Sequence, residues 1–357
     1  MNKSIKLFST AIPALAMAAG MALCCPNADA PAEALKTVVS NNQSAIEYTA
    51  TGKYESYNDF VVVDHQGYAK FIFNEASTQK YIDALNYYAE NLDEDINLYS
   101  MLVPTAAEWY VPEAYKSNFA KQRDVLDYVW NRTDPRIKKV DIYDKMNEHR
   151  DEYLYLKTDH HWTALGGYYG YTVLANVLGF QPMPMDYFTY RDTGIDFVGS
   201  IGWNTPTKQL EANPDHLYYF EVPHDITYTY YSNAGQAYTS KGVYKSQWLK
   251  DKNKYAYFMG GDLAVIKLQT DVHNGKKLLL MKDSYANTVV PLLTAHYEEI
   301  YLIDPRHSNY NVMNIIEENG IKDVLFLNYA RVTCLPSFSQ QMIELSRKTG
   351  GGIAAIK

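Results

Sequence analysis

The chain contains little cysteine, and its main body can form no internal disulfide. Of 3 cysteines in 357 residues, Cys24 and Cys25 fall in the N-terminal segment and Cys334 stands alone. A single thiol has no partner within the chain, so the fold must be held by its core. The sequence around Cys334 offers no histidine or helix start that would lower a thiol pKa, and we interpret it as structural.

Concentrated positive charge is also missing. The chain has 33 Lys and Arg residues against 41 Asp and Glu residues, a formal net charge of -8, and its basic residues form no cluster. Nucleic-acid binding requires concentrated Lys and Arg to neutralise phosphates. We therefore expect no nucleic-acid partner.

Residues 1–30 have the layout of an export signal. Two lysines precede an apolar stretch over residues 7–25, and an Ala-x-Ala site ends at Ala30. However, Pro31 would hinder cleavage, and the stretch approaches the roughly 20 residues needed to span a bilayer. The segment is either a signal peptide or an uncleaved anchor that would associate the protein with a membrane. Both readings predict an extracytoplasmic protein, whether secreted, periplasmic or attached to the cell surface.

Apolar runs alternate with helical patterns along the remaining chain, residues 31–357. Near the C-terminus, strands are expected at 278–281, 300–303 and 324–327, with helices between them. The other expected strands are 60–63 (with a turn at Gln66-Gly67), 96–103, 140–143 and 153–156, and the other expected helices are 78–92, 113–130 and 163–178. This alternation predicts a three-layer α/β/α domain, with a parallel sheet covered by helices on both faces.

The pattern breaks at about residues 180–255, where short Tyr-rich runs alternate with turn residues. We interpret this stretch as an inserted β-rich subdomain or long lid. The 33 tyrosines of the chain would suit a sugar-binding groove or a protein interface, but tyrosines also fill the boundary of a core. The core interpretation is favoured.

Two motifs carry the residues of a hydrolase triad. Residues 158–163 place Asp159 two positions before His161, ahead of a predicted helix, and residues 282–287 place Ser284 directly after a predicted strand. A serine hydroxyl is a weak nucleophile near neutral pH, so it needs a base and a carboxylate that orients the base. We expect Ser284, His161 and Asp159 to serve as nucleophile, base and orienting acid.

The expected topology brings these residues to one edge of the sheet. Ser284, Arg306 and Asn328 each follow the carboxyl end of a predicted strand, as do Asp159 and His161. Ligands of open α/β sheets bind outside those ends. All five side chains are therefore expected on one rim.

Each motif also has an alternative interpretation. Ser284 could simply cap a helix, and Asp283 is expected to be such a structural cap. Asp159 with His160 and His161 could hold a metal, but adjacent histidines cannot easily face one ion, and no second ligand cluster follows. His160 is interpreted as a neighbour of the base, and an exchange of roles with His161 stays open.

The Asp-His-His-Trp segment at 159–162 resembles the signature of the DHHW protein family, and Asp-Ser-Tyr at 283–285 resembles its downstream block. Residues 103–105 and 260–261 fit as well, so the resemblance extends over nearly the whole exported region. This family is related to the SGNH hydrolases, which place the serine first and Asp-x-x-His last. The reversed order here is similar to the permuted blocks of alginate O-acetyltransferases.

The resemblance implies an SGNH-type fold and assigns the triad to Asp159, His161 and Ser284. Its oxyanion hole would use the Ser284 amide, with Asn328 in the position of the superfamily's asparagine. The superfamily's glycine has no clear counterpart. Arg306 stands in that region and would stabilise the anion or bind substrate, unless it is a packing arginine.

We therefore expect an exported serine esterase or O-acyltransferase. The resemblance implies that it transfers acetyl groups on an extracytoplasmic polysaccharide or cell-wall glycan, without cofactor or metal, and it leaves the acyl donor open. The alternatives are a non-catalytic polysaccharide-binding surface protein that retains the fold, and a metal-dependent hydrolase.

Overall fold

The computed structural model describes residues 53–349 and Ile353. The predicted signal peptide or anchor at residues 1–30 therefore lies outside the described residues. Among the residues that are described, no helix combines the length and the apolar character needed to cross a membrane.

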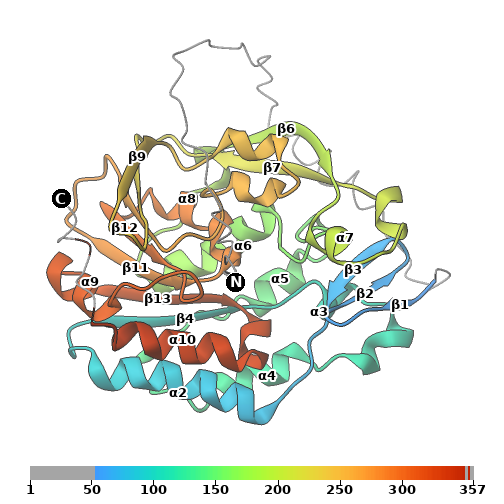
Figure 1. The fold of residues 1–357 in the computed structure, drawn as a ribbon, viewed down its shortest axis with the longest axis horizontal. Helices are drawn as coiled ribbons and strands as arrows, with labels where there is room; N and C mark the ends of the chain where they lie inside the picture. The colour runs from blue at the N-terminus through green and yellow to red at the C-terminus, as the bar shows by residue number, and fades with distance from the viewer. Residues whose placement is uncertain (1–52, 350–352, 354–357) are drawn as a thin grey trace, which may run out of the picture.

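An eight-stranded sheet forms the centre of the protein (Figure 1), in the order β5-β4-β13-β11-β12-β10-β8-β9. Its first five strands are parallel: β5 Ile137–Lys139, β4 Asn97–Val103, β13 Asp323–Tyr329, β11 Lys277–Lys282 and β12 Glu299–Ile303. The four inner strands of this group are mostly apolar and buried because both faces of a parallel sheet are covered, whereas Lys138 and Lys139 of the edge strand β5 are exposed. The predicted three-layer α/β architecture is confirmed.

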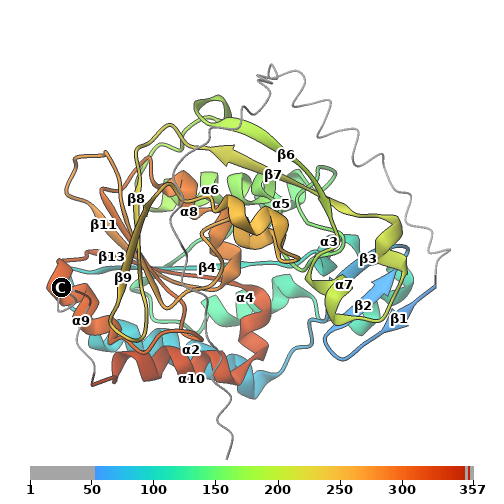
Figure 2. The ribbon, with the colours of Figure 1, turned by 45° about the horizontal axis from the view of Figure 1, so that its top comes forward.

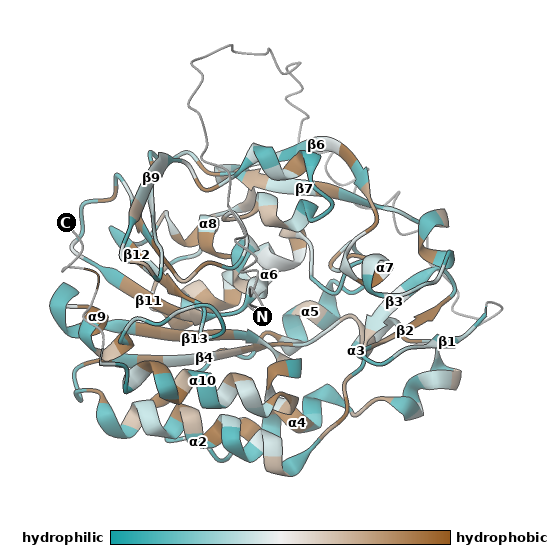
Figure 3. Cartoon of the chain, in the orientation of Figure 1, coloured by the Kyte–Doolittle hydropathy of each residue, from teal (hydrophilic) through white to brown (hydrophobic). Residues whose placement is uncertain are grey.

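Helices form a layer on each face of the sheet (Figure 1). One face carries α2 Glu75–Asn91, α4 Gln122–Trp130, α9 Val312–Asn319 and α10 Pro336–Ser346, and the other carries α5 Tyr143–Glu148, α6 Ala164–Val177 and α8 Val290–Leu293. Figure 3 shows apolar colour concentrated on the central strands and the inner helix faces. Each layer encloses its own hydrophobic cluster against the sheet.

The predicted insertion is divided between two sheets. Its strands β8 Thr227–Tyr231 and β9 Ala237–Lys241 extend the central sheet through β10 Val265–Gln269, in antiparallel pairing. Its strands β6 Thr189–Phe197 and β7 Asp215–Glu221 form a separate two-stranded sheet, with β7 in contact with α6 (Figure 2). Part of the Tyr-rich stretch thus belongs to the central sheet.

The strand predicted at 60–63 lies in a small sheet of its own. It is β2 Phe60–Val63, between β1 Glu55–Ser56 and β3 Gln66–Ala69, and all pairing is antiparallel. The predicted turn at Gln66-Gly67 is wrong because the chain reverses at Asp64 and His65, both with positive φ. A short apolar run does not reveal which sheet it will join.

Other predicted elements differ in type or length. The strand at 153–156 is wrong, since this stretch makes only one isolated bridge, between Tyr155 and Trp162. The strand at 140–143 is also wrong because β5 ends before it. The helix at 113–130 is divided into a 3-10 helix and α4.

Several shorter elements belong to the described part of the chain. They are α3 Ala107–Tyr110, α7 Ser200–Asn204 and the 3-10 helices Glu113–Asn118, Met185–Tyr187, Gln209–Ala212, Ser246–Lys250, Lys254–Tyr257, Ser284–Thr288 and Ala330–Cys334.

Candidate active site

The Asp-His-His-Trp segment is a loop. Its C-terminal end is held by contacts with α6 and with Tyr285, the residue after Ser284. Thr163 caps α6, with its hydroxyl oxygen accepting a hydrogen bond from the Gly166 N–H. Trp162 is fully buried, and its Nε1 donates to the Tyr285 carbonyl at 2.8 Å. A Cβ on Gly170 would lie 2.9 Å from the Trp162 ring, so glycine there leaves room for the indole.

Asp215, at the start of β7, fixes the other end of this loop. Its Oδ1 accepts hydrogen bonds from the Tyr153 hydroxyl at 2.5 Å and the Lys157 N–H at 2.7 Å. Its Oδ2 accepts from the N–H and the hydroxyl of Thr158. Burial raises the pKa of this carboxyl, and the four donors oppose that rise. Sequence reasoning missed Asp215 because it lies in the irregular Tyr-rich stretch.

Ser284, His161 and Asp159 form a chain of hydrogen-bonding contacts. The Ser284 Oγ lies 2.6 Å from His161 Nε2, and His161 Nδ1 lies 2.5 Å from Asp159 Oδ1. Ser284 and His161 are 123 positions apart in the chain. Ser284 is partly buried, whereas the His161 side chain is only 8% exposed and the Asp159 side chain 1%. The structure thus brings together the three side chains predicted as a triad.

The Asp159 carboxylate is held from a second side by the N-terminus of α7. Its Oδ2 accepts a hydrogen bond of 2.7 Å from the Ser200 N–H. A Cβ on Gly199 would lie 2.4 Å from the Asp159 Cβ, so any side chain there would displace the acid. Burial acts to raise the pKa of Asp159, but the contact with His161 outweighs it and the pKa falls below its usual range. Asp159 is therefore ionised.

Tyr255 packs flat against the ring of His161. The two rings are parallel within 6°, and their centroids are 3.8 Å apart. Tyr255 is buried in the 3-10 helix Lys254–Tyr257, and burial raises its pKa well above the ordinary value, so the ring is neutral. This contact restricts the plane of the imidazole. Sequence reasoning missed it because the residue belongs to the Tyr-rich stretch.

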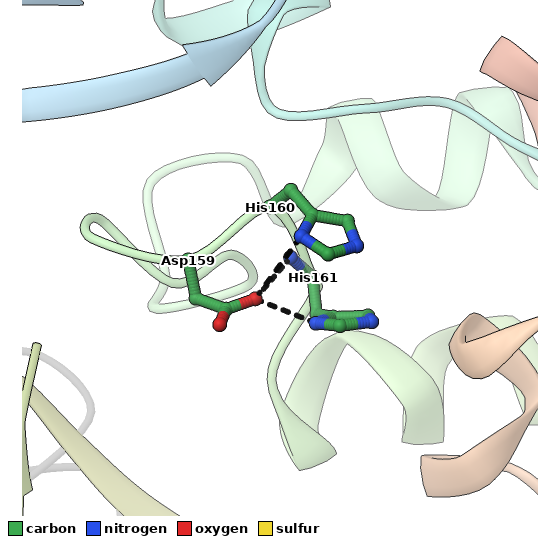
Figure 4. A group of neighbouring side chains, drawn as sticks. All are labelled: Asp159, His160 and His161. Carbon is green, nitrogen blue, oxygen red and sulfur yellow. Dashed lines mark hydrogen bonds and ion pairs between the residues drawn. The ribbon is translucent and has the colours of Figure 1, made fainter. Parts of the chain in front are cut away.

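His160 lies beside the base without a described contact to the serine. Its Nδ1 is 2.6 Å from the Ser200 Oγ, and its ring centroid is 3.9 Å from that of His161. In Figure 4 the two imidazoles lie close together and the Asp159 carboxylate points toward them. Burial lowers the pKa of His160 to about 3, so this ring is neutral at physiological pH. The geometry favours His161, not His160, as the partner of Ser284.

We expect His160→Asn to lower kcat/KM for an activated acetyl ester by less than about tenfold. The asparagine side chain can still accept a hydrogen bond near the position of Nδ1, and loss of a general base costs far more, roughly a hundred- to ten-thousandfold. Steady-state kinetics of p-nitrophenyl acetate cleavage would measure the change. A loss of a thousandfold in a folded His160→Asn variant would instead assign the base to His160.

Asp283 caps the helix that begins at Ser284. Its Oδ1 accepts from the Tyr285 N–H at 2.9 Å, and its Oδ2 accepts from the Tyr329 N–H at 2.9 Å. Asp283 is therefore a structural cap, as expected. The Ser284 hydroxyl contacts His161 Nε2 instead of capping the helix. The Ser284 N–H begins the 3-10 helix, so it has no acceptor within that helix.

Asn328 lies at the end of β13 and is fully buried. Its Oδ1 accepts a hydrogen bond of 3.0 Å from the Tyr81 hydroxyl of α2, and its Nδ2 has no partner among the described residues. No described hydrogen bond joins Asn328 to the serine or the base. Its assignment to an oxyanion hole stays a prediction.

Arg306 belongs to a charged cluster next to the serine strand. Its Nη2 donates to Asp262 Oδ2 at 2.8 Å and to Asp304 Oδ2 at 2.6 Å. Asp262 also accepts a hydrogen bond of 2.7 Å from the fully buried Lys282. Two carboxylates thus balance the Arg306 charge, and among the described contacts it does not reach the nucleophile or the base. Its binding of substrate stays a prediction.

Within residues 53–349, two groups of side chains have the composition of a cation site. Asp159, His160 and His161 bring ligand atoms within 4.8 Å of one another, as do Asp262, Asp304 and His307. A metal in the first group would compete with the hydrogen bond between Asp159 and His161. In the second group, ion pairs with lysine and arginine occupy both carboxylates. The described geometry therefore favours hydrogen bonding over metal binding in both groups.

Comparisons with known proteins agree with the motifs. The model of the family described as DHHW protein matches residues 32–303, more than half of the chain. A DHHW family protein from Eubacterium siraeum has a similar crystal structure, with 27% identity and a TM-score of 0.74 over 84% of this chain and 98% of that one. No protein of curated function is significantly similar in sequence.

Two further solved structures share less sequence. PatB1 of Bacillus cereus, captured with a sulfonyl adduct, is 19% identical with a TM-score of 0.65, over 78% of this chain and 96% of that one. The O-acetyltransferase domain of Pseudomonas putida AlgJ is 12% identical with a TM-score of 0.43, over 83% and 99%. The match over residues 32–303 decides the classification, and the chain belongs to the DHHW protein family.

Proposed function

We propose that this protein is an exported serine esterase or O-acyltransferase that moves acetyl groups on an extracytoplasmic glycan. The observation that carries the proposal is the contact chain from Ser284 through His161 to Asp159. In a hydrolase these three groups act as nucleophile, general base and orienting acid. The buried, ionised Asp159 faces His161 Nδ1. A carboxylate in this position favours the tautomer with the proton on Nδ1, which leaves Nε2 free to accept another.

The reaction has two halves. His161 Nε2 accepts the hydroxyl proton while Ser284 Oγ attacks the acyl carbonyl, and the resulting oxyanion collapses as the protonated imidazole returns the proton to the departing alcohol. This leaves an acetyl ester on Ser284. A glycan hydroxyl or a water molecule then attacks that ester, with His161 again accepting the proton. The second oxyanion collapses, the bond to Ser284 Oγ breaks, and the protonated imidazole returns the proton to that oxygen as the acetylated glycan or acetate leaves. The Ser284 N–H at the helix start is suited to donate to the oxyanion.

The family relationship supports the acetyl group and the glycan. The permuted order of the two blocks is similar to that of alginate O-acetyltransferases, which modify a polysaccharide. PatB1 shares the fold and has been captured with a sulfonyl adduct, and sulfonylating reagents react with activated nucleophiles. The predicted export of residues 31–357 would bring such an enzyme to extracytoplasmic glycans.

Tracking the acetyl group would test this proposal. We expect the purified protein to release p-nitrophenol from p-nitrophenyl acetate, and mass spectrometry to find acetylated oligosaccharide when a suitable acceptor is present. Acetate as the sole product under all conditions would make the protein an esterase. Glycan binding without cleavage of the activated ester would reject the enzyme and favour a polysaccharide-binding protein.

A further inference from the structure

A pocket of about 620 Å³ opens between three segments that are distant in the sequence. It is lined by residues 56–60, which include the turn from β1 to β2, by Asn204 at the end of α7, and by Arg331 in the 3-10 helix after β13. The small sheet and α7 lie side by side in Figures 1 and 2. Its volume falls within the range of about 300–1,000 Å³ typical of small-molecule sites.

The pocket is connected to the candidate active site through α7. This helix begins at Ser200, whose N–H holds Asp159 and whose Oγ contacts His160. It ends at Asn204, whose Nδ2 donates to the Ser200 carbonyl at 2.7 Å. Arg331 comes two residues after Tyr329, whose ring centroid lies 6.2 Å from that of His160. The pocket therefore borders the His160 side of the site.

The lining suits a sugar ring. The partly buried rings of Tyr57 and Phe60 provide apolar surfaces, and the exposed amides of Asn58 and Asn204 provide both donors and acceptors. Phe60 also packs against the small apolar cluster that includes Ile201 of α7. This packing supports the part of the pocket wall that Phe60 forms. Sugars combine apolar ring faces with many hydroxyl groups, and this surface matches both.

The charges of the pocket are paired within it. The Arg331 guanidinium donates to Asp59 and, through Nε, to the Lys70 carbonyl at 3.0 Å. Its side chain is 17% exposed and that of Asp59 is 61% exposed. Outside the lining, the nearby carboxylate of Glu55 is paired with Lys53. A ligand carboxylate would be repelled by Asp59, whose charge already balances that of Arg331. The hydroxyls of a neutral sugar carry no charge and can donate hydrogen bonds to the Asp59 carboxylate.

We propose that this pocket is the acceptor subsite for a neutral sugar residue, in preference to a uronic acid. The inference rests on the proposed function and specifies its substrate class. A neutral sugar bound between the aromatic rings and the Asp59–Arg331 pair would direct the rest of its oligosaccharide toward His160, which lies beside the triad. The Asp59 carboxylate acts as a specificity determinant because it rejects acidic sugars.

Isothermal titration calorimetry with tetrasaccharides would test the subsite. The neutral probes are chitotetraose, cellotetraose and mannotetraose, and the acidic probe is tetramannuronate. We expect at least one neutral probe to bind about tenfold more tightly than tetramannuronate, and Tyr57→Ala to weaken its binding by about tenfold because a ring contact is lost. Asn58→Ala, an exposed substitution, should weaken binding as well and covers the case in which Tyr57→Ala fails to fold.

A second variant tests whether the charge of Asp59 excludes acidic sugars. Asp59→Asn keeps the shape but leaves Arg331 without an anionic partner, so tetramannuronate should bind about tenfold more tightly than to the parent. Asp95→Asn is the matched control, since Asp95 is 64% exposed and pairs with Lys322 at 2.5 Å. It should leave all affinities unchanged.

Three results would overturn the subsite: no neutral probe binds, tetramannuronate binds the parent more tightly, or both wall variants bind like the parent. Cleavage of p-nitrophenyl acetate is measured in parallel. A parent protein that cannot cleave this ester refutes the proposed function, while the titrations still decide whether the pocket binds neutral sugars.

Discussion

Replacing Ser284 with alanine is expected to lower kcat/KM for p-nitrophenyl acetate on the order of 10⁵- to 10⁶-fold. Removing a triad nucleophile costs on this scale because the covalent route disappears, and the remaining base has no hydroxyl to activate. The His161–Asp159 pair keeps its own hydrogen bond, so the fold should persist. Steady-state kinetics would measure the loss, and circular dichroism would verify folding.

Labelling supplies a second measurement of the same residue. A fluorophosphonate should add to the parent protein at one peptide, residues 282–287, and should leave Ser284→Ala unlabelled. Ser117→Ala is the matched control because Ser117 is exposed in the 3-10 helix Glu113–Asn118, and it should label and turn over like the parent. Equal activity of the parent and Ser284→Ala would reject the serine mechanism.

Asp159→Asn is expected to lower kcat/KM by about 10⁴-fold through the tautomer of His161. The two Asp159 oxygens both accept hydrogen bonds: Oδ1 faces His161 Nδ1 and Oδ2 faces the Ser200 N–H. An asparagine has only one acceptor. If its amide NH₂ faces His161, the imidazole proton moves to Nε2 and the ring can no longer accept the serine proton.

The other orientation of the amide carries a different cost. An NH₂ group facing the Ser200 N–H would bring two donors together in a buried place, which destabilises a folded protein by about 1–3 kcal/mol. This cost disfavours the second orientation, so we expect Asp159→Asn to adopt the first one and to lose activity as stated above. Asp95→Asn, on the surface, should leave the activity unchanged. A stable Asp159→Asn variant within tenfold of the parent would remove Asp159 from the mechanism.

Local patterns explain why much of the fold was predictable. The strands that became β11, β12 and β13 are short apolar runs between helix signals, and such runs are buried in parallel sheets whatever the details of packing. The end of the helix α6 was indicated by Gly179, which has a positive φ in the structure. Because parallel strands end at one edge, the approach of the serine segment to the histidine loop could also be predicted.

Other elements depended on contacts that no local pattern contains. Residues 153–156 form an apolar run like that of a buried strand. Their side chains do pack into the core, but their backbone makes only one isolated bridge, between Tyr155 and Trp162. The Tyr-rich stretch has no clear period, so nothing indicated that β8 and β9 would join the central sheet. Propensity describes the conformation of a segment but not its partner.

The amino-acid sequence alone determined the family, the α/β class and the identity of Ser284, His161 and Asp159 as the residues to examine, because each depends on residue types at short spacing. Only the tertiary structure decided what surrounds them. The hydrogen bonds from Asp215 to the loop before α6, and the stacking of Tyr255 on His161, join parts of the chain that are far apart in sequence. Burial then sets their chemistry, since the same carboxylate or imidazole has a different pKa once packing removes it from water.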